Sequence, residues 1–174
     1  MVTLYLMRHA KSSQADRGLD DKDRPLNARG RGAAAAIGRY FLEHSLRPTL
    51  ILCSTAQRTR ETLEIVREAA LWPADEPTTR YIDGLYLATP SEILRTIADI
   101  PDSTETVLVI GHNPGLHELA LSLAGVGSAT YPDLLAHFPT GALAVLTSPD
   151  ATWPRLAGSR LILSSFVQPR DLSD

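Results

Sequence analysis

The sequence predicts an α/β protein, a single-domain three-layer α/β/α sandwich with a mainly parallel (mixed) sheet. Apolar runs of strand length alternate along the chain with longer segments whose apolar residues recur at helical spacing. Because parallel neighbours are joined through a helix, this alternation indicates βαβ units and helices on both faces of the sheet. The length of 174 residues fits one domain over residues 1–174 that buries its own core.

Six segments are predicted as strands from their apolar and β-branched composition. Residues 3–7, 49–53 and 106–110 are apolar without alternation, which is typical of strands buried on both faces. The remaining strands are predicted at residues 143–147, at residues 161–165 and, as a shorter run, near residues 79–82.

Helices are predicted over residues 27–45, 56–70 and 114–124 from the spacing of their apolar residues. In the second of these, Leu63 lies on the apolar face, and charged residues such as Glu61 are expected to turn away from it. These helices follow predicted strands, as a layered α/β fold requires.

Local signals complete the pattern. Thr89-Pro90-Ser91-Glu92 forms a capping box with proline in the first helical position, so a helix is predicted to begin there. Residues 11–22 are polar and charged and are predicted to form a loop beside the site. Residues 74–78 and 125–139 are expected to be irregular as well.

Bulk properties narrow the class of protein. A net charge of −3 argues against a nucleic-acid partner, which calls for a basic patch or stripe. Cys53 is the only cysteine, so no intramolecular disulfide can form and a reducing compartment is indicated. Arg8 interrupts the opening apolar run, and no run approaches the roughly 18 apolar residues that cross a bilayer. We therefore expect a cytoplasmic protein without membrane contact; the sequence leaves its oligomeric state open.

Charged and imidazole side chains follow three of the predicted strands. Arg8 and His9 follow the first strand, Arg58 follows the second within Ser54-Thr55-Ala56-Gln57-Arg58-Thr59, and His112 follows the strand at residues 106–110. Carboxyl ends of parallel strands meet at one edge of the sheet, where α/β folds bind their ligands. The sequence therefore predicts one site that contains two arginines and two histidines.

This combination suits phosphoryl transfer, which depends on an aligned nucleophile and on cations or N–H dipoles around the phosphoryl oxygens. His9 is the candidate nucleophile, because nearby arginines disfavour its protonation and a backbone carbonyl can fix its tautomer. Arg8 and Arg58 present planar forks that match phosphate oxygens, and Arg58 lies in the first turn of a helix. His112 is expected to donate a further hydrogen bond to the phosphoryl group.

Three further residues are candidates for the substrate side of the site. Arg24 is either a substrate ligand or an exposed charge at the entry to a helix. Ser12 follows the nucleophile and is either part of the pocket or an ordinary loop serine. Asn113 is either a turn residue or a substrate contact.

At these residues the sequence resembles the histidine phosphatase superfamily, and within it the SixA-type phosphohistidine phosphatases. The matching elements are Arg8-His9-Ala10, Arg58, His112, Asp23-Arg24-Pro25-Leu26, Arg29-Gly30, Pro139-Thr140-Gly141, Pro169-Arg170-Asp171-Leu172 and residues 109–116. The resemblance implies a phosphoglycerate mutase-like fold and catalysis without metal or cofactor. It also implies that His9 is phosphorylated, that Arg8, Arg58 and His112 form the phosphate pocket, and that Arg24 contacts substrate.

Two rival chemistries lack their residues. A cysteine phosphatase needs five residues between the cysteine and the arginine, and Cys53 and Arg58 are separated by four, with Cys53 inside an apolar strand. A metal hydrolase needs clustered ligands such as a His-Glu-x-x-His helix, and the sequence has no such motif.

The expected substrate follows from the leaving group. Related alcohol phosphatases carry a glutamate general acid, but the corresponding stretch here contains only Asp83, which is either a substitute acid or a turn residue before Gly84. A phosphohistidine needs such an acid less, because neutral imidazole can depart. We therefore predict a phosphohydrolase that acts on phosphohistidine in a partner protein through a phosphorylated histidine. The alternatives are a phosphomonoesterase for a small phosphorylated metabolite and a phosphate- or phosphoprotein-binding module without turnover.

Overall fold

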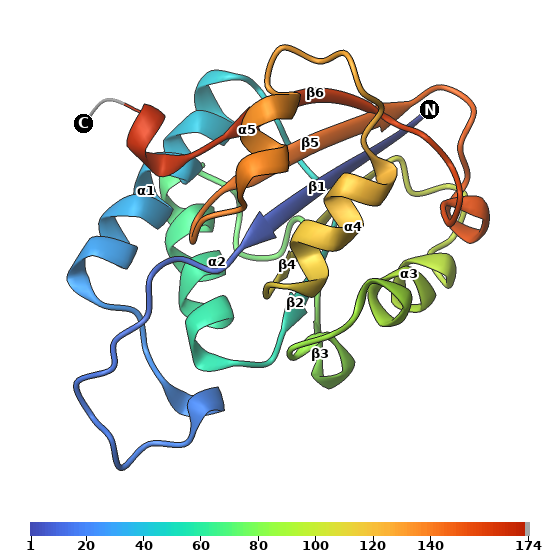
Figure 1. Ribbon diagram of the computed structural model, residues 1–174. Coiled ribbons are helices and arrows are strands. Elements are labelled where there is room, and N and C mark those ends of the chain that lie inside the picture. The colour runs from blue at the N-terminus through green and yellow to red at the C-terminus, as the bar shows by residue number, and fades with distance from the viewer. Residues whose placement is uncertain (173–174) are drawn as a thin grey trace.

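The computed structural model describes residues 1–172 and contains one six-stranded sheet between two layers of helices (Figure 1). The strands are β1 (Val2–Arg8), β2 (Leu50–Ser54), β3 (Thr78–Ile82), β4 (Thr106–Gly111), β5 (Leu143–Ser148) and β6 (Ile162–Val167). The helices are α1 (Ala28–Glu43), α2 (Gln57–Ala69), α3 (Pro90–Ala98), α4 (Gly115–Leu123) and α5 (Tyr131–Ala136).

The sheet has the order β3-β2-β4-β1-β5-β6. The pairs β2–β3, β2–β4 and β1–β4 are parallel, whereas β5 runs antiparallel to both β1 and β6. The predicted mainly parallel, mixed sheet is confirmed, and β1 lies inside it with β4 and β2 on one side.

Alternate residues of β1 face the two helical layers, because successive side chains of a strand point to opposite faces. Leu4 and Leu6 pack in the core beneath α3, α4 and α5. Tyr5 and Met7 pack in the core beneath α1 and α2. The near-continuous apolar composition of β1 follows from this double burial.

The predicted strands and the three helices with apolar stripes differ from the observed elements by at most two residues at either end. The capping box is confirmed, since Thr89 accepts a hydrogen bond from the Glu92 backbone and the Glu92 side chain accepts one from the Thr89 backbone. None of the helices within residues 1–172 combines the length and apolar character needed to cross a membrane.

One expectation is wrong. The segment over residues 125–139 is not wholly irregular, because α5 forms there with Pro132 in its first turn. Its only buried residue is Leu134, so the sequence offers no repeating apolar pattern.

Glu61 is buried although it is charged. It accepts a hydrogen bond from the Leu26 backbone and pairs with Arg31, and it thereby ties the loop after β1 to α2.

Candidate active site

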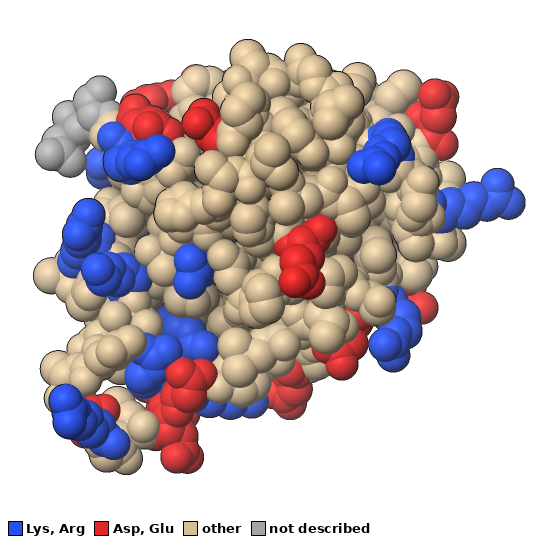
Figure 2. Space-filling view, in the orientation of Figure 1, with Lys and Arg blue, Asp and Glu red and all other residues tan. Residues whose placement is uncertain are grey.

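The candidate site lies where β2, β4 and β1 end side by side. Arg8 is the last residue of β1 and His9 follows it, His112 follows β4, and Arg58 lies in the first turn of α2 directly after β2. The structure brings these four side chains together around a cavity of about 430 Å³. Lys and Arg side chains gather on this side of the molecule, near the carboxyl end of β1 (Figure 2). The cavity is lined by Arg8, His9, Lys11, Ser12, Gln14, Asp21, Arg24, Arg58, Leu87, His112, Asn113 and Thr140.

His9 is fixed through both its backbone and its ring. Its N–H donates to the Gly111 carbonyl at 3.1 Å, and its carbonyl accepts from the Gly141 N–H at 2.9 Å. Ring atom Nδ1 lies 2.7 Å from the Ala10 carbonyl oxygen. A carbonyl only accepts, so Nδ1 carries the proton and Nε2 keeps a free electron pair. The expected bond to a backbone carbonyl is confirmed, and Ala10 supplies it.

The environment of His9 favours the neutral ring. Burial lowers its pKa to about 4, and the charges of Arg58, Arg8 and Arg24 act in the same direction, against the opposing hydrogen bond to Ala10. From the sequence we expect a lowered pKa and assign it to the arginines alone. The largest cause is instead burial, since His9 is only 7% exposed. A neutral ring with a free Nε2 is the form that can act as a nucleophile.

We expect the His9 ring to stay neutral until the pH falls to about 4. An NMR titration of the ring signals in phosphate-free buffer measures this, with the His9 signal assigned by its loss in His9→Asn. A midpoint near the ordinary histidine value of about 6.5 would show that the ring is neither buried nor close to the arginines as described here.

Both pocket arginines keep an N–H group free of protein acceptors. Arg8 donates one terminal N–H to the Phe138 carbonyl at 3.1 Å, and Arg58 donates to the Asp21 carbonyl at 2.7 Å and carboxylate at 3.0 Å. Within residues 1–172, the buried Nε atoms of Arg8 and Arg58 have no hydrogen-bond partner. Buried donors without acceptors are costly, so an anion that supplies oxygen atoms would relieve them.

His112 connects Arg58 to the sheet. Its Nε2 lies 2.7 Å from the Ser54 hydroxyl, and its Nδ1 lies 3.5 Å from a terminal nitrogen of Arg58. Because Arg58 can only donate, this contact favours Nδ1 as acceptor and Nε2 as donor to Ser54. Burial, with His9 and Arg58 adding to it, lowers the pKa of His112 to about 3. A bound phosphoryl dianion would favour the protonated ring, which could then donate to it.

Asp21 is a cavity residue that the sequence analysis missed. Its carboxylate accepts hydrogen bonds from Arg24, Arg58 and the hydroxyl of Tyr86. The Tyr86 hydrogen bond, followed by those from the two arginines, holds the pKa of Asp21 well below its usual range. Its place in the acidic stretch before Arg24 is the only sequence signal, because contact with Arg58 depends on how the loop folds back over α2.

The three predicted substrate-side residues all line the cavity. Arg24 donates to the Ser12 hydroxyl at 2.8 Å, so these two side chains hold each other in place. Asn113 donates through Nδ2 to the Phe138 carbonyl at 2.8 Å, and its buried Oδ1 has no partner within residues 1–172. Their contact with substrate stays a prediction.

Asp83 is not among the residues that line the cavity, which favours the turn residue over the general acid as its role. Its carboxylate is exposed, accepts a hydrogen bond from the Thr55 hydroxyl at 2.6 Å and pairs with Lys22 at 3.1 Å. These two partners lower its pKa, so the group stays ionised. An acid must carry a proton and reach the leaving group, and Asp83 meets neither condition.

Cys53 is inert in this setting. It is buried in β2, and burial raises the pKa of its thiol to about 12, so the predicted unreactive thiol is confirmed. Among residues 1–172, no group of three or more His, Cys, Asp or Glu side chains could hold a metal ion.

An α/β sheet whose strand ends bring two arginines and two histidines around one cavity has the residues that phosphoryl transfer requires, which is the chemistry of a phosphatase. A sequence model of the histidine phosphatase superfamily (branch 1) matches residues 4–78. A solved structure from Nakamurella multipartitia, named after the phosphohistidine phosphatase SixA, is 35% identical with a TM-score of 0.81, and the match covers 97% of this chain and 96% of that one. The chain belongs to the histidine phosphatase superfamily.

Two further comparisons found a sequence relative and a structure of the same fold. An uncharacterised protein of Mycobacterium tuberculosis is 38% identical over 143 residues, which cover 80% of this chain and 85% of the relative. An Escherichia coli structure named after α-ribazole-5′-phosphate phosphatase is 18% identical with a TM-score of 0.62, covering 86% of this chain and 92% of its own. The latter likeness concerns the fold alone.

Proposed function

We propose that the protein removes the phosphoryl group from a phosphohistidine in a partner protein, by way of a phosphorylated His9. The observation that carries this is the absence of a protonated carboxyl group among the described residues that line the cavity. Asp21 is their only carboxylate, and three hydrogen-bond donors keep it ionised. An alkoxide leaving group needs a proton, whereas neutral imidazole departs without one. The likeness to the SixA-named structure supports the same substrate class.

In the first step, Nε2 of His9 attacks phosphorus while the bond from phosphorus to the substrate imidazole breaks. The substrate ring, protonated on its other nitrogen, leaves as neutral imidazole. The His9 ring takes up the positive charge. Its proton stays on Nδ1, which donates a hydrogen bond to the Ala10 carbonyl. Arg8 and Arg58 stabilise the phosphoryl oxygens through the Nε–H groups that have no other partner in the described part of the chain.

In the second step, water attacks phosphorus and the bond to Nε2 breaks. His9 departs as neutral imidazole, and both protons of the water stay on the product as dihydrogen phosphate. The low pKa of His9 favours this step, because a ring that resists positive charge is a good leaving group. The Arg8 and Arg58 donors serve both steps, since the phosphoryl oxygens stay in one place.

A phosphomonoesterase for a small phosphorylated metabolite is the second candidate. The cavity of about 430 Å³ is large enough for a small phosphorylated molecule. Such a substrate would have to bring its own proton or a good leaving group, because Asp83 lies outside the cavity. A module that binds phosphate without turnover would use the same two arginines.

A substrate comparison separates these functions. Purified protein is given a phosphohistidine-bearing protein and a panel of sugar and alcohol phosphates, all in the presence of chelator. We expect kcat/KM to favour phosphohistidine by about 10²-fold or more, the usual lower range for a missing general acid. Preference for one alcohol phosphate would replace the proposed substrate, and binding without phosphate release from either class would indicate the binding module.

A further inference from the structure

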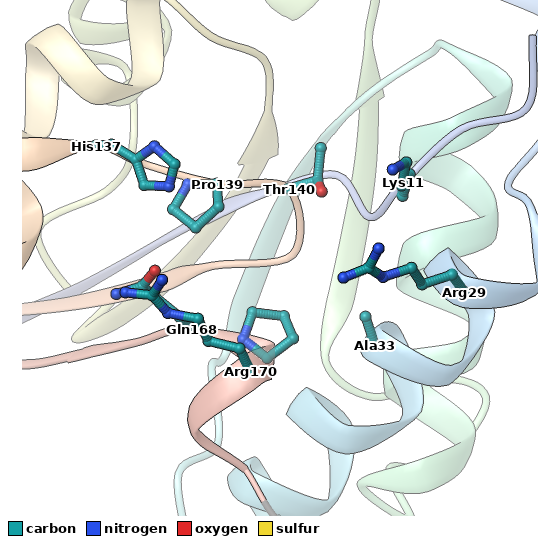
Figure 3. A pocket seen from close by; sticks show the side chains of 9 residues that line it. Lys11, Arg29, Ala33, His137, Pro139, Thr140, Gln168 and Arg170 are labelled. Carbon is teal, nitrogen blue, oxygen red and sulfur yellow. The ribbon is translucent and has the colours of Figure 1, made fainter.

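Figure 3 shows a second cavity, of about 210 Å³. Lys11 and Thr140 line both this cavity and the first, so the two lie side by side near the carboxyl end of β1. We call the second cavity the cationic cleft. Its lining residues are Lys11, Arg29, Ala33, His137, Pro139, Thr140, Gln168, Pro169 and Arg170.

Two of the three cations that line the cleft have no carboxylate partner among the described residues. Among residues 1–172, no Asp or Glu lines the cleft. The side chains of Lys11 and Arg29 make no hydrogen bond or ion pair within this range, and Arg170 pairs with its neighbour Asp171 at 3.8 Å. In the first cavity, by contrast, Asp21 pairs with both Arg24 and Arg58. The positive charge of the cleft is therefore a local excess in a chain whose net charge is −3.

Close backbone contacts fix the walls of the cleft. A Cβ atom on Gly30 would lie 2.1 Å from the Lys11 carbonyl oxygen, so glycine allows α1 to bring Arg29 beside Lys11. Gly141 has a φ of +78°, and a Cβ atom there would lie 2.9 Å from the ring of Pro169. Figure 3 shows Lys11 and Arg29 on one side, and Gln168, Arg170 and His137 on the other.

Gln168 suggests what kind of ligand fits. Its side chain is 2% exposed, and its buried Oε1 has no hydrogen-bond donor within residues 1–172. A fully ionised anion such as sulfate offers only acceptors, which suit Lys11, Arg29 and Arg170 but leave Oε1 unsatisfied. A polypeptide with acidic side chains offers carboxylates for the cations and backbone N–H groups for Oε1.

We infer that the cationic cleft binds an acidic segment of the phosphoprotein substrate while the phosphohistidine occupies the adjoining cavity. This inference rests on the proposed function. The segment gains charge pairs with Lys11, Arg29 and Arg170, and one chain can reach both cavities because Lys11 and Thr140 line each of them. The cleft thus selects partners that carry acidic residues near their phosphorylated histidine.

Peptide binding tests the cleft separately from catalysis. The probe is a fluorescein-labelled peptide with one unphosphorylated histidine flanked by glutamates, and its matched control has glutamines instead. We expect the glutamate peptide to bind more tightly, and the double variant Arg29→Glu/Arg170→Glu to weaken its binding on the order of tenfold, because two exposed charge pairs are reversed. The control double variant, Arg95→Glu/Arg155→Glu, makes the same charge change at exposed positions outside both cavities.

Turnover then links the cleft to substrate choice. In Arg29→Glu/Arg170→Glu, the ratio of kcat/KM on an acidic phosphohistidine protein to kcat/KM on phosphoramidate should fall about tenfold, mainly through KM. Equal affinity for the two peptides, equal losses in both double variants, or binding of pyrophosphate but not peptide would overturn the inference. If the peptide results hold but wild-type protein releases no phosphate from phosphohistidine, the proposed function fails and the acidic-peptide site stands.

Discussion

Replacing His9 with alanine is expected to lower turnover by about 10⁶-fold, as loss of the nucleophile does in other enzymes that form covalent intermediates. The variant lacks Nε2, the atom that the bond to Ala10 leaves free to attack phosphorus. His44→Ala is the matched control, because His44 is exposed at the end of α1 and stacks on Tyr40. Phosphate release from a phosphohistidine protein measures both variants.

Rapid quenching identifies the phosphorylated residue directly. Wild-type protein mixed with labelled substrate should carry acid-labile, base-stable label on His9, and His112→Ala should still accept it because the nucleophile is retained. Label on a serine, or wild-type turnover in His9→Ala, would assign the attack to another group. A loss in His44→Ala as large as that in His9→Ala would point to damage of the fold rather than to chemistry.

The fold could be predicted from local patterns because most elements bury a recognisable apolar face. The runs that became β1, β2 and β4 are buried on both sides, which leaves a continuous apolar signal. The order of the strands depends on contacts between distant segments, so the antiparallel direction of β5 could not be assigned from its composition. Helix α5 was missed because six residues with one buried leucine carry no period.

The central site residues could be predicted because parallel strands end at the same edge of a sheet, independently of the conformation of the loops. Arg8, His9 and His112 adjoin β1 and β4, so their convergence follows from the topology. Asp21 could not be found this way, since its contact with Arg58 depends on the path of the loop after β1. The two alternatives for Asp83 stayed open for a related reason: sequence position does not reveal that its carboxylate turns to Lys22.

We expect the positive charge of Arg58 alone to be insufficient to stabilise the transferring phosphoryl group. It is 2% exposed, and its guanidinium reaches Asp21 and His112 while Nε has no partner among residues 1–172. A guanidinium offers several N–H donors in one plane, whereas the lysine ammonium is a compact point charge. Lysine at this position would keep the positive charge but could not hold Asp21 and two phosphoryl oxygens together.

We expect Arg58→Ala to lower kcat/KM by about 10²- to 10³-fold, near 3 kcal/mol, by analogy with loss of one oxyanion donor. Arg58→Lys should restore only a minor part. The fold should survive, because Asp21 keeps its hydrogen bonds from Arg24 and Tyr86, and thermal unfolding checks this. Arg60→Ala, on the same helix, is the control. Arg60 donates to the Thr55 carbonyl and lies over Tyr81, outside the cavity. We therefore expect its replacement to lower kcat/KM by the equivalent of less than about 0.5 kcal/mol. Full activity in Arg58→Lys would mean that charge, not the geometry of the guanidinium, stabilises the transferring group.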